Sequence, residues 1–278
     1  MAVTISIANE KGGVGKTTTA VNLAAGLAMR LRADGRGDRR ILLVDIDPQG
    51  HALLSTAYGR HTAEAGESLA ALLTETPPPS VQRMIRQSVH HPNLYIIPGN
   101  RAAMSRAARL LPSLIANESR LQRALAPVQP LFEYIIIDTP PNIGDLLVNA
   151  LVAATHVLIP VETSYLGVSG LRELQQTIQS VCFHLRPDLQ ILGYLPTLCD
   201  EQRSETHEIL AELQNRYGGQ VFDPIHKATD LAYAHSSHMD VFTYRPARQR
   251  DQLASSSRAT QEYAALVETI LQITGQPA

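Results

Sequence analysis

Apolar residues form short, nearly continuous runs along the chain, and these runs alternate with longer segments whose apolar positions recur every three or four residues. The runs at 41–46, 134–138 and 157–161 are rich in Ile, Leu and Val, as expected for strands that are buried on both faces. This alternation predicts an α/β fold, a mostly parallel twisted sheet with helices on both faces. The predicted strands are Val3–Ala8, Ile41–Ile46, Leu94–Pro98, Tyr134–Asp138, Val157–Val161 and Ile191–Leu195.

The longer periodic segments predict amphipathic helices. The first runs from about Gly15 to Arg32, and others are predicted at Leu166–Leu185, Arg203–Tyr217 and Gln261–Ile273. A chain of 278 residues is long enough for one large α/β domain, so we expect residues 1–278 to form a single domain.

Composition narrows the function classes. With a formal charge of -2, the chain has no global field to attract nucleic acid, and any DNA contact must come from a local patch. Its cysteines, Cys182 and Cys199, are too few for a disulfide framework, and we expect them to pack as small apolar residues in a reducing cytoplasm. No apolar run reaches the ~18 residues that a membrane span needs.

The strongest chemical signal is Lys-Gly-Gly-Val-Gly-Lys-Thr-Thr, which lies between a predicted strand and a predicted helix. Glycines let backbone N–H groups close around phosphate oxygens, and the helix N-terminus adds partial positive charge. Lys16 can then reach the β and γ phosphates of a nucleotide, and the Thr17 hydroxyl can ligate Mg²⁺. The predicted nucleotide-binding residues are Lys11, Gly12, Gly13, Val14, Gly15, Lys16, Thr17 and Thr18.

Two further strands end in carboxylates. Asp45 and Asp47 follow one run, in Asp-Ile-Asp-Pro-Gln-Gly, and Asp138 follows another, in Asp-Thr-Pro-Pro. Carboxylates at strand ends beside a phosphate loop are placed to hold Mg²⁺ or to orient water. Thr17, Asp45 and Asp138 are therefore the predicted metal ligands, and the sequence does not apportion the metal between the two aspartates.

These motifs, in this order, resemble the ParA/MinD class of P-loop ATPases, whose phosphate loop is a deviant Walker A motif. Glu10 stands where the strict motif has its first glycine, and Lys11 adds a second lysine. The resemblance covers roughly residues 1–245. It implies ATP and Mg²⁺ as cofactors, Lys11, Lys16 and Asp47 as catalytic residues, and a homodimer that ATP assembles when Lys11 reaches the partner's nucleotide.

The resemblance also implies partners. A ParA-type partition protein binds DNA without sequence preference, works with a ParB-like adaptor, and is cytoplasmic and nucleoid-associated. An alternative cargo is a protein assembly such as carboxysomes or chemoreceptor clusters. The candidate DNA contacts are Arg203, Lys227, Arg245, Arg248 and Arg250, which could neutralise phosphates without reading bases.

Other classes share the phosphate machinery. A MinD-like membrane anchor is not expected, because the last amphipathic segment carries no cation on its polar side. An iron–sulfur reductase would need paired cysteines at motif positions. Cys182 and Cys199 lie away from those positions, so this class is excluded. A small-molecule ligase or kinase of the same fold stays open. His226 and Ala228 stand where members often have a Pro and an Asn near the adenine, so the adenine contacts are not predicted.

Overall fold

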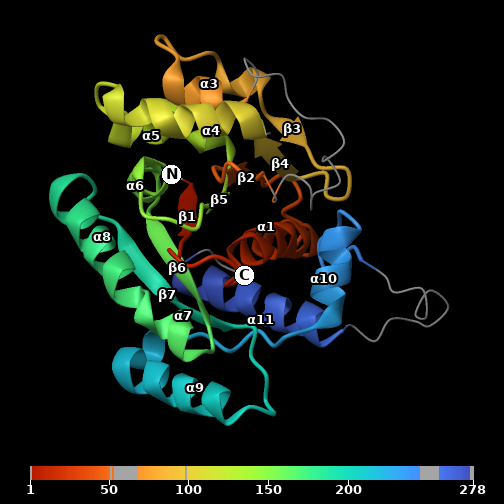
Figure 1. The fold of residues 1–278 in the computed structure, drawn as a ribbon. Helices are drawn as coiled ribbons and strands as arrows, with labels where there is room; N and C mark the ends of the chain where they lie inside the picture. The colour runs from red at the N-terminus through yellow and green to blue at the C-terminus, as the bar shows by residue number, and fades with distance from the viewer. Residues whose placement is uncertain (1, 51, 53–67, 98, 245–256, 276–278) are drawn as a thin grey trace.

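The computed structural model describes residues 2–50, 52, 68–97, 99–244 and 257–275. Within these residues seven strands form one sheet in the order β3-β4-β2-β5-β1-β6-β7, as Figure 1 shows. The strands are β1 Val3–Ile7, β2 Ile41–Asp45, β3 Arg86–Gln87, β4 Leu94–Ile97, β5 Tyr134–Asp138, β6 His156–Glu162 and β7 Gln190–Thr197.

All neighbouring pairs are parallel except β3 with β4. The carboxyl ends of β1, β2 and β5 therefore meet at one edge of the sheet. The register places Asp138 of β5 directly beside Ile7 of β1 on one side and Asp45 of β2 on the other. The two predicted metal-binding aspartates are thus neighbours across adjacent strands.

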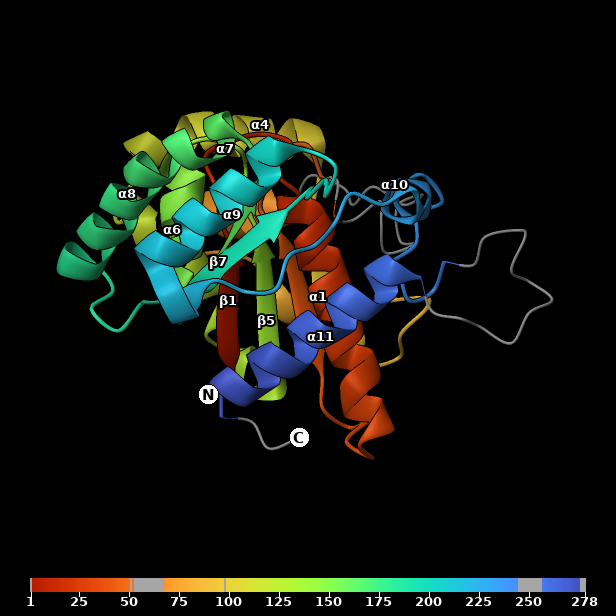
Figure 2. The same ribbon diagram turned by 90° about the horizontal axis from the view of Figure 1, so that it is seen from below.

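Helices cover both faces of the sheet. On one face, α1 (Lys16–Ala33) packs beside α11 (Arg258–Ile273), as Figure 2 shows. The other face is covered by α3 (Leu69–Thr74), α4 (Arg101–Leu110), α5 (Arg120–Leu125), α6 (Asp145–Ala153), α8 (Leu171–His184) and α9 (Ser204–Tyr217). Two short helices, α7 (Tyr165–Ser169) and α10 (Thr229–Ser236), complete the set in the described residues.

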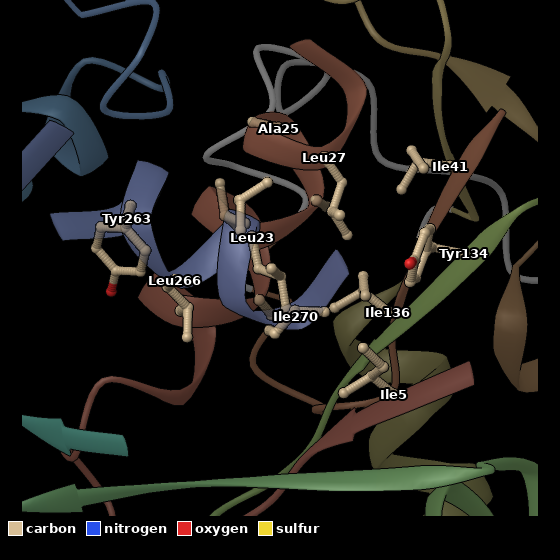
Figure 3. Packing of buried hydrophobic residues seen from close by; sticks show 14 of the residues in the cluster. Ile5, Leu23, Ala25, Leu27, Ile41, Tyr134, Ile136, Tyr263, Leu266 and Ile270 are labelled. Atoms are coloured by element: carbon tan, nitrogen blue, oxygen red, sulfur yellow. The ribbon is translucent and has the colours of Figure 1, made fainter. Parts of the chain in front are cut away.

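The core beneath α1 and α11 fixes where the first loop begins. Leu23 and Leu27 of α1 and Ile270 of α11 meet Ile5 and Ile136 of the central strands, and Figure 3 shows these side chains converging. Because all of them are fully buried, α1 is held firmly against the strand that precedes it. The loop between β1 and α1 is consequently carried on two rigid elements.

The predicted fold class and predicted strands are confirmed, with ends that shift by one or two residues; Pro98 lies outside the described residues. The helix predicted over Leu166–Leu185 is wrong as one element, because the chain forms α7 and α8 with Gly170 between them. A Cβ at Gly170 would lie 2.4 Å from Glu10 Oε1, so the junction leaves room for the phosphate loop. The short strand β3 and helices α5, α6 and α10 were not predicted.

Candidate active site

The glycine-rich loop connects β1 to the N-terminus of α1. Gly13 has a φ of 78° and Gly15 a φ of 84°, a backbone conformation that residues with a Cβ rarely adopt. Gly15 is also the N-cap of α1, so the unpaired N–H groups of the first helical turn face the loop. This geometry produces a concave set of donors with partial positive charge, which suits a phosphate group.

Two polar side chains fix the loop to neighbouring strands. The Asn9 side chain, fully buried, donates to Pro160 O at 2.6 Å and accepts from Lys11 N at 3.0 Å. Thr197 Oγ1 at the end of β7 donates to Val14 O at 2.9 Å. Neither residue was predicted from the sequence, although Asn9 directly follows the first predicted strand.

Lys16 points into the loop. Its side chain is buried, and its ammonium donates to Lys11 O at 2.7 Å. Burial lowers the pKa of Lys16, and the charges of Asp138 and Asp47 act in the opposite direction. An ammonium in this position can exchange the carbonyl for the oxygens of an incoming phosphate.

The three predicted carboxylates gather beside Lys16 but have different surroundings. Asp45 accepts backbone N–H groups on both oxygens, from Asp47 at 3.1 Å and from Ala52 at 2.9 Å. Asp47 accepts from Gln49 N at 2.9 Å and lines the cleft. Asp138 is fully buried, and among the described residues neither of its oxygens makes a hydrogen bond of normal geometry, although the nearby Thr17 hydroxyl acts to lower its pKa.

An unpaired buried carboxylate is costly unless something binds it. Burial, followed by the charge of Asp45, raises the pKa of Asp138 well above its usual range. No three His, Cys, Asp or Glu side chains gather into a metal site in the described part of the chain. Mg²⁺ at a nucleotide site needs only one or two carboxylates besides phosphate oxygens and water, so Asp138 with Thr17 fits that ion.

Lys11 points away from the loop. Its ammonium lies 2.8 Å from Glu162 Oε2 at the end of β6, and the two side chains are 29% and 32% exposed. The two lysines of the motif therefore point in different directions, Lys16 inward and Lys11 toward the surface. Glu162 had not been singled out by sequence.

Glu10 meets a second carboxyl group from α8. Burial, and after it the charge and hydrogen bond of Glu173, raises the pKa of Glu10. The loop therefore carries a carboxyl–carboxyl contact that sequence reasoning missed, because Glu173 is distant in the chain.

A cleft of about 570 Å³ extends from the phosphate loop. Its far wall is largely apolar, which suits a nucleoside, and α11 contributes Tyr263. His226, at a position that departs from the family pattern, is held by Glu262 through its ring Nδ1 at 2.6 Å and its backbone N at 2.8 Å. The residues of the far wall are Thr197, Leu198, Ile225, His226, Lys227, Ala228, Leu231, Ala232, His235 and Tyr263.

Of the predicted DNA contacts, Arg203 and Lys227 lie in the described residues, on neighbouring segments joined by a hydrogen bond from Lys227 N to Cys199 O at 2.9 Å. Arg203 pairs with Asp200 at 3.3 Å. Lys227 is exposed and also lines the nucleoside end of the cleft. Its charge is therefore available both to a nucleotide in the cleft and to a partner at the surface. Arg245, Arg248 and Arg250 lie outside the described residues.

The remaining sequence predictions concern the cysteines and the membrane. Cys199 is buried and Cys182 is half-buried, and both are free thiols; burial raises the pKa of Cys199 to about 11, so its thiol stays protonated and inert. Among the described helices, none has the length and apolar character to cross a membrane.

Comparisons with known proteins agree with this site. Residues 2–191 match the family model AAA_31, described as an AAA domain. The chain is 36% identical over 247 residues to the sporulation initiation inhibitor protein Soj of Bacillus subtilis, covering 88% of this chain and 92% of that one. It is 38% identical over 225 residues to the chromosome partitioning protein ParA of Myxococcus xanthus, covering 80% and 74%.

Among solved structures, a Mycobacterium smegmatis protein titled cobyrinic acid a,c-diamide synthase, with bound ADP and magnesium, is 28% identical with a TM-score of 0.78. The alignment covers 99% of this chain and 96% of that one. The fold and site define a P-loop nucleotide hydrolase with a two-lysine phosphate loop. The chain belongs to the AAA_31 family and, within it, to the ParA/Soj group of partition-type ATPases.

Proposed function

We propose that this chain is an ATP-driven switch that moves DNA, and that ATP joins two copies of it face to face. The observation that carries the proposal is the opposite orientation of the two lysines in one phosphate loop. Lys16 is buried against its own loop, whereas Lys11 is part-exposed and pairs with a part-exposed carboxylate, that of Glu162. A lysine so placed is free to reach a nucleotide bound by a second protomer.

ATP and Mg²⁺ are the cofactors, and the chain hydrolyses ATP. The loop residues 11–18 bind the phosphates, with Lys16 on the β and γ groups. Thr17 and Asp138 would hold Mg²⁺, which would screen the charge of the phosphates. Asp45 positions the segment that carries Asp47 through its two backbone hydrogen bonds, and Asp47 orients the attacking water.

The proposed cycle has two states. The ATP-bound dimer binds duplex DNA without sequence preference, and hydrolysis, stimulated by a ParB-like adaptor, separates the protomers and releases the DNA. Residues 1–278 act as one domain, in the cytoplasm and on the nucleoid. The cargo is chromosomal or plasmid DNA, or alternatively a protein assembly carried over the nucleoid.

A second candidate function, a small-molecule ligase, is favoured by the likeness to the structure titled cobyrinic acid a,c-diamide synthase. The two functions differ in what stimulates ATP turnover. A partition switch turns over faster with DNA and an adaptor, whereas a ligase turns over only with its organic acid. Measuring phosphate release with each addition separates them.

DNA binding itself is tested by fluorescence anisotropy with two short duplexes of unrelated sequence. The protein with Mg²⁺ and ATP should bind both equally, and the protein with ADP should bind far more weakly. If a dimer engages about six phosphates, affinity should fall about a thousand-fold between 50 and 200 mM salt. Equal binding with ADP and ATP, or a strong preference for one duplex, would contradict the proposal.

A further inference from the structure

Basic residues are concentrated in one stretch of the chain. Residues 76–132 contain seven arginines and a single acidic residue, Glu118, although the whole chain has 24 basic and 26 acidic residues. The stretch includes β3, β4, α4 and α5. Helices α4 and α5 lie together on the outer layer of one face of the sheet, as Figure 1 shows.

The exposed side of α4 carries three of these arginines. Arg101, Arg106 and Arg109 are exposed, and at 100° per residue they fall within an arc of about 140°. The opposite side of the helix carries Ala103, Met104 and Ala107, which are buried. The residues between the arginines, such as Ala102 and Ser105, are short, so a broad partner could approach the helix closely.

These guanidinium groups are not neutralised. In the described part of the chain, no carboxylate pairs with Arg83, Arg101, Arg106 or Arg109, whereas arginines elsewhere, such as Arg203, do pair with carboxylates. Arg120 and Arg123 of α5 donate to the backbone carbonyls of Leu73 and Ala116, respectively. These neutral acceptors hold the two side chains in place without neutralising their positive charge.

We propose that this arginine surface, formed by Arg101, Arg106 and Arg109 on the exposed face of α4, binds the phosphate backbone of duplex DNA. The inference rests on the proposed function and deepens it by placing the contact. From Arg101 to Arg109 the helix rises about 12 Å, and a duplex presents one negative charge per about 1.7 Å of its axis. Several phosphates therefore lie within reach of one helix.

A duplex fits this surface better than an acidic polypeptide does. The cleft on the same layer, about 580 Å³, is lined by α3, residues 113–116 and α5, and none of the α4 arginines contributes to it. The exposed α4 face therefore lies outside that cleft. Such a face offers a peptide no groove, but it does offer phosphates a row of donors that is indifferent to base sequence.

The position of α4 also connects the surface to the nucleotide. The helix begins directly after β4, where the Asn100 side chain caps it by accepting from Ala103 N at 2.9 Å. One residue earlier, a Cβ at Gly99 would lie 3.8 Å from Asp45 O. The N-terminus of α4 therefore abuts the strand whose carboxylates serve the nucleotide site.

The test compares two triple variants with the same change in net charge. R101Q/R106Q/R109Q removes the α4 arginines, and R32Q/R172Q/R216Q removes three exposed arginines from other helices. Both should keep ATP-driven dimerisation and basal hydrolysis, because none of these residues lines the nucleotide cleft. DNA affinity is measured by anisotropy with ATP, as a function of salt.

The α4 variant should lose at least about tenfold in affinity, and the slope of log K against log salt should become shallower by about 2.7 per protomer, whereas the control should match the parent. If the parent binds DNA with ATP and the α4 variant binds equally well, the arginine surface is overturned while the proposed function stands. If the α4 variant instead loses binding to polyglutamate and keeps its binding to DNA, the surface binds an acidic protein and the inference is overturned. A parent that binds no DNA in any nucleotide state overturns the DNA step of the proposed function itself.

Discussion

The ammonium group of Lys11 lies 2.8 Å from Glu162 Oε2 of the same chain. Both side chains are about 30% exposed, so the ion pair contributes at most about 1 kcal/mol to stability. A contact this weak can be exchanged for the phosphates of a nucleotide on another protomer. The pair therefore describes a resting position for Lys11 within one chain.

Lys11→Ala should still bind ATP but lose the ATP-dependent dimer, because Lys16 and the loop backbone remain in place. Calorimetry measures the first property and light scattering the second. Glu162→Gln is the matched control: it removes the ion pair but keeps Lys11, and it should dimerise with ATP as the parent does. Equal loss of dimer in both variants would assign the defect to the broken pair rather than to Lys11.

Lys16→Ala should abolish ATP binding. Its ammonium is buried beside the loop carbonyl of Lys11, and no other cation can take its place on the β and γ phosphates. Titration calorimetry with ATP and Mg²⁺ should show no heat of binding, while circular dichroism remains that of the parent. Binding within about tenfold of the parent would remove Lys16 from the assigned role.

Asp47→Ala should bind ATP and stay dimeric while hydrolysis falls by about 10² or more, the scale of losing a group that positions the attacking water. Because Asp47 also accepts from Gln49 N, Asp47→Asn serves as a second variant that preserves the turn. Phosphate release should fall in both variants. Normal hydrolysis by Asp47→Asn would move the role to Asp138 or to a water held by the backbone.

The phosphate loop and the strand-end carboxylates could be predicted from sequence because each lies within a few residues of a strong motif. The predicted strands 134–138 and 41–46 place Asp138 and Asp45 at one edge, and the structure pairs them directly. Which of the two is free for a metal could not be predicted, because it depends on backbone N–H groups of residues 47 and 52 that bond only Asp45. The roles of the site residues remain predictions.

Contacts made by distant segments were the part that sequence could not supply. Tyr263 enters the cleft only because α11 packs against α1, and Glu162 reaches Lys11 across 151 residues of chain. The single helix expected over 166–185 is interrupted at Gly170, where a Cβ would lie 2.4 Å from Glu10 Oε1, so the contact with Glu10 requires a glycine. Periodicity within one segment carries no information on such neighbours.

Glu173→Gln should stabilise the protein at pH 7 but not at pH 4. Burial and the charge of Glu173 raise the folded-state pKa of Glu10 above its ordinary 4.5, so the folded state loses stability as the pH rises from about 4.5 through the raised value. Removing the charge of Glu173 therefore stabilises the folded state at pH values above this range. It changes the stability little at pH values below the range. Thermal unfolding at both pH values measures the effect.

Glu205→Gln is the control for this pH effect, since Glu205 also lies in the first turn of a helix. It should show no gain that depends on pH. A gain of equal size at pH 4 and pH 7 for Glu173→Gln would mean that packing, rather than the charge beside Glu10, is responsible.

In the proposed cycle, ATP joins two protomers through Lys11. The most direct test is light scattering of the Asp47→Ala protein, which we expect to retain ATP, compared with the Lys11→Ala/Asp47→Ala double variant under the same conditions. We predict that Asp47→Ala has the mass of two chains with ATP and of one chain with ADP, and that the double variant has the mass of one chain with either nucleotide. A double variant that still reaches the mass of two chains with ATP would contradict the account.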